Sequence, residues 1–322
     1  MKLIGQIMLF AALLCMSAWT CAQTFPGKPM RLLVPFPAGG PADLYARELS
    51  QGMGSRLGQP MLVENKGGAA GTLAIETVAK SAPDGYTLAL AAASALVMAP
   101  FARSSLGYDA RKDFALITTV AKNPEVLVAN PSVPAKTLRE FVAFLKANPG
   151  KINYGSTGSG GVTHLAAENF RLEVGVDIVH VPYSGAAPVV TALLGGHVQM
   201  AVLGIPAVIP HLASGKLRAI ALMSGQRAAA MPDVPTTVEG GYPKLLSDFW
   251  YGLIGPAAIP QSAQARLRSA AVATLESPSV QEQFIKAGAV SFPSTSEEFM
   301  TFMLAEQAKW GGTIKAIGFK ED

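Results

Sequence analysis

The feature that most constrains this chain is a repeated alternation of short apolar runs with longer amphipathic ones. Residues 30–36, MRLLVPF, predict a buried strand, and residues 41–58, PADLYARELSQGMGSRLG, follow with the spacing of a helix. The same order returns over residues 61–93 and again over residues 151–224. Strands that alternate with helices form parallel sheets with helices on both faces. The pattern therefore predicts an α/β fold.

Two such α/β blocks are visible, and proline-bearing extended segments connect them. These segments are VAKNPEVLVANPSVPAKT on the way out of the first block and MPDVPTTVEGGYPKLLSDFWYGLIGPAAIP on the way back. The 322 residues, half of them hydrophobic, are enough for two modest cores. We expect a first lobe of residues 23–122 and 236–322, a second lobe of residues 123–235, and a hinge at the crossing segments.

The N-terminus has the pattern of a secretory signal peptide. Lys2 precedes an apolar stretch, LIGQIMLFAALLCMSAW, and Ala22 supplies a small residue at the end of the segment. We expect cleavage after residues 1–22 and export to the periplasm; a retained membrane anchor is the alternative. Both cysteines, Cys15 and Cys21, lie in the segment to be removed, so the mature chain would have neither a disulfide nor a cysteine metal site.

The charge pattern argues against a nucleic-acid partner. The formal net charge is +4, and it is spread along the chain without a basic block or aromatic residues between basic ones. A mildly basic protein of this kind suits a small acidic partner at least as well.

The loop PFPAGGPAD, residues 35–43, joins the first predicted strand to its helix without any lysine or arginine. A helix begins with backbone N–H groups that lack partners, and its dipole places partial positive charge there. Gly39 and Gly40 would let an anion approach these donors, because no side chain covers them. Pro41 suits the first turn, and Asp43 can cap a neighbouring donor. The loop has the parts of an anion site; a plain strand-to-helix turn is the alternative.

A second loop of this kind, GSTGSGG at residues 155–161, precedes a helix that begins near Val162. Its hydroxyl and N–H groups can receive an anion, but it lacks the third glycine of a dinucleotide fingerprint and the lysine of a P-loop. A third junction, VPYSGAAP, lies at residues 181–188. Ligands of open α/β sheets bind beyond the carboxyl ends of the strands. Loops of both lobes are therefore expected to face one cleft and to clamp a small anion.

The chain resembles the Bug (TctC-like) family of periplasmic solute-binding proteins, which serve tripartite tricarboxylate transporters. The resemblance runs in order through MRLLVPFPAGGPADLYAR, GQPMLVENKGGAAGTLA, PDGYTLALAAAS, NYGSTGSGGVTHLAAE, HVPYSGAAPVVTALLGGHVQMAV and WYGLIGPAAIP to KWGGTIKAIG, over essentially the whole mature chain. It implies a type II periplasmic-binding-protein fold, in which two α/β lobes close on a small carboxylate, and membrane permease subunits as partners. We expect a monomer without cofactor or metal.

The resemblance also implies which residues hold the carboxylate, partly through ordered water. They lie in the strand-to-helix loops of both lobes: Pro37, Ala38, Gly39, Gly40 and Asp43 in the first, and Ser156, Thr157, Gly158, Ser159 and His164, with Tyr183, Ser184 and Gly185 nearby, in the second. Ser94 follows a predicted strand where the family often has small polar residues that face the cleft. The stretch GAAGTLA departs from the more glycine- and asparagine-rich pattern of the family, so contacts from residues 67–72 are not expected.

Two other functions use the same residues differently. In a secreted serine hydrolase, Ser159 and His164 would be nucleophile and base, but the chain has no Gly-x-Ser-x-Gly elbow, and a helix would turn the two side chains apart. No two of the four histidines are within one helical turn of each other, as a helical metal site would require. We therefore expect a binding protein and not an enzyme. Transport and ligand sensing for a membrane signalling partner both remain open.

Overall fold

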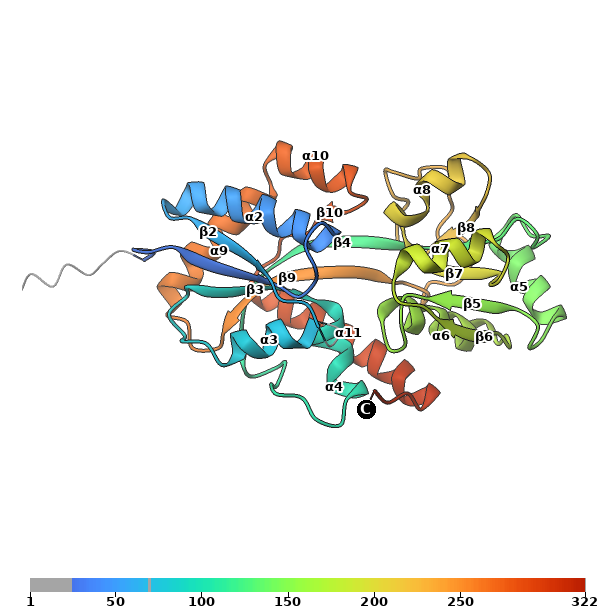
Figure 1. The fold of residues 1–322 in the computed structure, drawn as a ribbon, viewed down its shortest axis with the longest axis horizontal. Coiled ribbons are helices and arrows are strands. Elements are labelled where there is room, and N and C mark those ends of the chain that lie inside the picture. The colour runs from blue at the N-terminus through green and yellow to red at the C-terminus, as the bar shows by residue number, and fades with distance from the viewer. Residues whose placement is uncertain (1–24, 69–70, 322) are drawn as a thin grey trace, which may run out of the picture.

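The computed structural model describes residues 25–68 and 71–321, and the predicted signal peptide lies outside these residues. Two α/β lobes lie side by side, and the long strand β4 and the strand β9 run between them (Figure 1). The α/β prediction is confirmed.

The described residues form ten strands that hydrogen-bond into one continuous network. The strands are β1 (Met30–Val34), β2 (Met61–Asn65), β3 (Thr87–Ala92), β4 (Phe114–Ala129), β5 (Asn153–Ser156), β6 (Val179–Pro182), β7 (Met200–Gly204), β8 (Arg218–Leu222), β9 (Asp248–Pro256) and β10 (Val290–Ser291). The helices are α2 (Pro41–Leu57), α3 (Thr72–Ala79), the π-helix η2 (Ser94–Met98), α4 (Ala99–Ala102), α5 (Leu138–Ala147), α6 (Val162–Val174), α7 (Ala186–Leu194), α8 (Ile205–Ala213), α9 (Gln261–Leu275), α10 (Pro278–Lys286) and α11 (Ser296–Ile317).

The sheet of the first lobe has the order β2-β1-β3-β9-β4, and β4-β7-β5-β6 continues it into the second lobe. Strands β1, β2 and β3 are parallel, as are β5, β6 and β7. The prediction of parallel sheets is wrong for β4, β8 and β9, which pair antiparallel to their neighbours. Antiparallel pairing arises because β4 and β9 cross between the lobes in opposite directions.

Strand β4 belongs to both lobes. From Phe114 to Pro124 it pairs with β9, and from Glu125 to Ala129 it pairs with β7, while β8 pairs along its other edge. Its sequence is rich in β-branched and apolar residues, and almost every position is buried. Pro124 has no N–H to donate and stands where the strand changes partners. The boundary predicted between residues 122 and 123 falls inside this strand.

Three apolar clusters form the hydrophobic core of the protein. One lies between α2, α9 and the first sheet, a second lies under α7 and α8, and a third continues from the first lobe into the second along α11. Trp250 and Trp310 are fully buried in the third cluster. In Figure 1, α11 extends from the first lobe to beneath the second. None of the helices in the described residues is both long and apolar enough to cross a membrane.

Candidate functional site

A cavity of about 230 Å³ lies between the lobes, and we call it the cleft cavity. Its walls come from the starts of four helices and from the two crossing strands. The lining residues are Pro41, Asn123, Glu125, Thr157, Val162, Thr163, Ala186, Gly204, Pro206, Ala207, Phe249 and Tyr251.

The helices α2, α6, α7 and α8 all begin at this cavity with a glycine as N-cap. These are Gly40, Gly161, Gly185 and Gly204, and in the described residues no side chain caps any of the four helices. Helices α5 and α11, which begin elsewhere, each carry a complete Thr-Glu capping box. Each of the four helix starts therefore places the positive end of its dipole at the cleft cavity, although Pro41 in α2 and Pro206 in α8 have no N–H and the Asp43 N–H donates to the Gly40 carbonyl.

The lining residues supply little other positive charge. Among the described residues that line the cavity, none is a lysine, an arginine or a histidine, and Glu125 is the one acidic side chain. Any attraction for an anion must therefore come from backbone N–H groups and neutral polar side chains. The sequence predicts such a role for the loop at Gly39 and Gly40, and Pro41, which follows this loop, lines the cavity.

Hydroxyl groups hold the second loop at the start of α6. The Thr163 hydroxyl accepts a hydrogen bond from the Thr157 backbone N–H at 2.9 Å, and the two threonine hydroxyls bond each other at 2.9 Å. Both threonines also line the cavity. The loop is thus fixed from inside, and its glycines leave the helix start uncovered.

Asp43 is buried beneath the first loop. Its carboxylate accepts hydrogen bonds from Arg47 Nε at 2.9 Å, from the Gly39 backbone N–H at 3.0 Å and from Asn65 Nδ2 at 3.0 Å. The Arg47 guanidinium is the main reason that the pKa of Asp43 falls to about 2, against the opposing effect of burial. The ionised carboxylate therefore positions the loop before α2.

Asp43→Asn is expected to lower stability at neutral pH by about 2 kcal/mol, because the wild-type carboxyl has a folded-state pKa below its unfolded value. That contribution is complete above about pH 4 and is lost as the pH falls toward 2. Urea unfolding of both proteins between pH 2 and 7 measures the difference. Curves that stay the same distance apart across this range would show that Asp43 makes no such contribution.

The other predicted site residues lie in several places. Pro37, Ala38 and Gly39 are exposed in the loop before α2, Thr157 lines the cavity, and Gly158 follows it in the second loop. Ser156 is buried, with its hydroxyl 2.6 Å from His180 Nε2. Tyr183 is half-buried, Ser184 is exposed, and Gly185 begins α7. Ser94 is buried in η2, and the structure does not bring it to the cleft cavity.

Ser159 and His164 line a different cavity, of about 550 Å³, together with Glu168, Arg171 and His180 among others. His164 Nδ1 accepts a hydrogen bond from the Gly160 backbone N–H at 3.0 Å, and its ring stacks on His180 with centroids 4.0 Å apart. Burial, followed by the charge of His180, lowers the pKa of His164 to about 4. A histidine held in this way, with its Nδ1 bonded to a backbone N–H, is not arranged as the base for Ser159.

Sequence reasoning missed the floor of the cavity, which the crossing strands supply. Asn123 and Glu125 of β4 and Phe249 and Tyr251 of β9 line it. The Phe249 and Tyr251 rings lie 5.2 Å apart, so the floor is aromatic on one side and polar on the other. The available signal was the pair Asn123 and Glu125, two polar side chains within an otherwise apolar strand.

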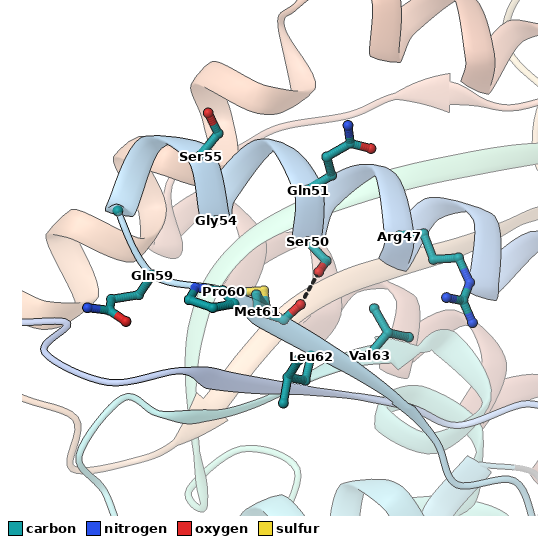
Figure 2. A pocket seen from close by; sticks show the side chains of 11 residues that line it. Arg47, Ser50, Gln51, Gly54, Ser55, Gln59, Pro60, Met61, Leu62 and Val63 are labelled. Carbon is teal, nitrogen blue, oxygen red and sulfur yellow. Dashed lines mark hydrogen bonds between the residues drawn. The ribbon is translucent and has the colours of Figure 1, made fainter.

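A larger groove of about 690 Å³ lies between α2 and β2 in the first lobe (Figure 2). The Ser50 hydroxyl in this groove points to the Met61 carbonyl and donates a hydrogen bond to it. The groove has no helix starts converging on it, in contrast to the cleft cavity. In the described part of the chain, no three histidine, cysteine or acidic residues are grouped so that they could hold a metal ion.

Known proteins resemble the chain over nearly its full length. A family model described as a tripartite tricarboxylate transporter family receptor matches residues 45–319. Protein BugT from Bordetella pertussis is 35% identical over 320 residues, which cover 99% of this chain and 98% of BugT.

Solved structures resemble it as well. One, described as a periplasmic transporter, is 40% identical with a TM-score of 0.80. The match covers 92% of this chain and 100% of the chain in that structure. MatC from Rhodopseudomonas palustris, solved with bound malate, is 31% identical with a TM-score of 0.76, over 90% of this chain and 100% of MatC.

Proposed function

The chain belongs to the tripartite tricarboxylate transporter receptor family, the Bug or TctC-like proteins, and on that basis we propose that it captures a small carboxylate in the cleft cavity. The observation that carries the proposal is the convergence of four glycine-capped helix starts on one cavity without a basic side chain. The carboxylate bound to MatC is consistent with this ligand class.

The ligand would be held by backbone donors and by the loop hydroxyls. The first lobe contributes the loop that ends at Gly40, and the second contributes Thr157, Gly158 and the start of α7 at Gly185. A hydrogen bond to a charged group contributes about 1.5–3 kcal/mol net, and micromolar affinity needs about 8 kcal/mol, so four or five such bonds are sufficient. The remaining residues of the two loops would act through ordered water.

Closure of the lobes would complete the site. The division proposed is residues 23–122 and 236–322 against residues 123–235, with β4 and β9 as the crossing between them. An empty cleft would favour the open form, and the ligand would stabilise the closed form by its greater affinity for it. The closed form is then the form presented to membrane permease subunits. A monomer exported by a cleaved signal peptide, without catalytic activity, fits this use.

Removing the charge of the ligand is expected to abolish most of the binding. Malate and succinate should raise the melting temperature of the mature protein, whereas their di-amides, which carry no carboxylate, should bind with a Kd at least roughly 30-fold higher, because the loss of a single charge-assisted hydrogen bond already costs about 2 kcal/mol. Thermal shift followed by titration calorimetry measures this. Equal affinity for acid and amide would show that the carboxylate does not bind at the helix starts. The absence of a thermal shift with every carboxylate would overturn the proposed function.

A further inference from the structure

Asn123, which lines the cleft cavity, has a buried hydrogen-bond acceptor without a donor among the described residues. Asn123 is 6% exposed, and its Nδ2 donates to the Tyr45 hydroxyl at 2.7 Å and to the Gly288 carbonyl at 3.3 Å. A carbonyl can only accept, so the contact with Gly288 fixes which end of the amide is nitrogen. Within the described residues no donor reaches Asn123 Oδ1. A buried acceptor without a partner is costly and calls for an explanation.

Glu125 places a second acceptor beside it. The side chain is 1% exposed, and its Oε2 accepts a hydrogen bond from the Ser247 hydroxyl at 2.5 Å. Asn123 and Glu125 are two positions apart on β4, which puts their side chains on the same face of the strand, and both line the cavity.

No cation is paired with Glu125 among the described residues. Asp248 on β9 and Lys309 on α11 are the charged groups that act on it, with opposite signs. The Lys309 ammonium donates to Glu306 Oε1 at 2.5 Å and to the Leu246 carbonyl at 3.1 Å, so it is engaged elsewhere. Burial is the main reason that the pKa of Glu125 rises to about 8.

The two sides of the cavity therefore differ in chemistry. Helix starts present donors and partial positive charge, whereas the floor at Asn123 and Glu125 presents acceptors. A plain dicarboxylate would satisfy the donors, but above about pH 8, where Glu125 is ionised, it would bring negative charge toward another carboxylate. A molecule with a carboxylate at one end and a donor at the other would satisfy both sides.

We propose that the ligand of this chain is a small aminocarboxylate, whose protonated amine hydrogen-bonds to Asn123 Oδ1 and Glu125 while its carboxylate meets the helix starts. This inference rests on the proposed function and narrows its substrate class. MatC was solved with malate, which has no amine, so an amine is not required by every member of the family.

Matched ligand pairs that differ only in the amine test the inference. Aspartate is compared with succinate, glutamate with glutarate, and alanine with propionate, by calorimetry on the mature protein. At least one aminocarboxylate is expected to bind tighter than its partner by about tenfold or more, as expected for one charge-assisted hydrogen bond. Glu125→Gln keeps the size of the side chain and its contact with Ser247, and it should reduce the ratio to about one. Glu168→Gln, a buried glutamate outside the cleft cavity, is the control and should keep the ratio.

The pH dependence of affinity gives a second readout. A protonated amine binds best when Glu125 is ionised. Below pH 8, binding of an aminocarboxylate should therefore release a proton from Glu125, and its affinity should increase as the pH rises from 6 to 8. A carboxylate that binds beside neutral Glu125 should weaken above pH 8 instead. Both slopes should disappear in Glu125→Gln.

The outcomes separate the two proposals. If no carboxylate of either kind binds, the proposed function fails. If succinate or glutarate binds as tightly as its amino partner, with affinity that falls above pH 8, the proposed function stands and the aminocarboxylate inference is overturned. Water would then be the partner of Asn123 Oδ1.

Discussion

Valine in place of Gly40 is expected to weaken carboxylate binding about 100-fold, because it covers the donors at the start of α2 and offers no acceptor or donor in exchange. Loss of two charge-assisted hydrogen bonds corresponds to about 3 kcal/mol, which is about that factor. Calorimetry with the best ligand of the carboxylate panel measures the effect.

Gly40 is the right position for this test because its backbone accepts a side chain. Its φ is −89°, and an added Cβ would find only the Pro37 carbonyl, at 3.9 Å. Gly39 has φ +86°, so a substitution there would strain the loop as well as cover the donors. Valine at an N-cap costs about 1 kcal/mol of stability, and the fold should survive it.

Gly312→Val is the matched control. Gly312 lies in α11, away from the cleft cavity, and an added Cβ would meet nothing within 4 Å. This variant should bind with wild-type affinity. Unchanged affinity in Gly40→Val, with the control also unchanged, would mean that the start of α2 does not hold the ligand.

Glu125→Gln is expected to make the unliganded protein more stable, by about 2–4 kcal/mol at pH 8. The folded-state pKa of Glu125 is about 8, whereas the ordinary value is 4.5. Between these values the folded chain holds a proton that the unfolded chain has released, so wild-type stability falls as the pH rises from about 4.5 to 8. Each pH unit is worth at most about 1.4 kcal/mol, and water in the cleft reduces the total.

Urea unfolding of both proteins from pH 4 to 9 tests this. The two should be similar near pH 4, where Glu125 is neutral in both states, and should diverge as the pH rises. Glu168→Gln again serves as the control, since that glutamate accepts hydrogen bonds from Tyr154 and Arg171 and gains nothing from neutralisation. A wild-type curve that runs parallel to the Glu125→Gln curve would show that Glu125 carries no such cost.

Local patterns predicted most of the elements, but of the predicted site residues only Thr157 lines the cleft cavity. The strand at residues 30–36 and the helix that follows it appear as β1 and α2, and the glycine loop between them leads to Pro41, which lines the cleft cavity. These features depend on neighbours in the chain, which periodicity and turn residues report directly. Helix α5 was missed although its signal was present: Thr137 and Glu140 form a capping box with both hydrogen bonds in place.

The floor could not be predicted because it forms between distant parts of the chain. Pro124 pairs with Asp248, more than a hundred residues later, and only that pairing puts Glu125 beside Ser247 and brings β9 into the cleft. The placement of His164 also depends on the fold. Its ring stacks on His180 of β6 and lines another cavity, whereas Thr157 lines the cleft cavity.

Strand β4 links the two lobes covalently, and it also lines the cleft cavity in which we propose that the ligand binds. A substitution at Asn123 or Glu125 that suits the protein to another metabolite therefore also alters the stiffness of that link. A change of ligand selectivity through the floor of the cavity is therefore coupled to the transition between the open and closed forms. Changes in the helix-start loops do not touch the crossing strand and avoid this coupling.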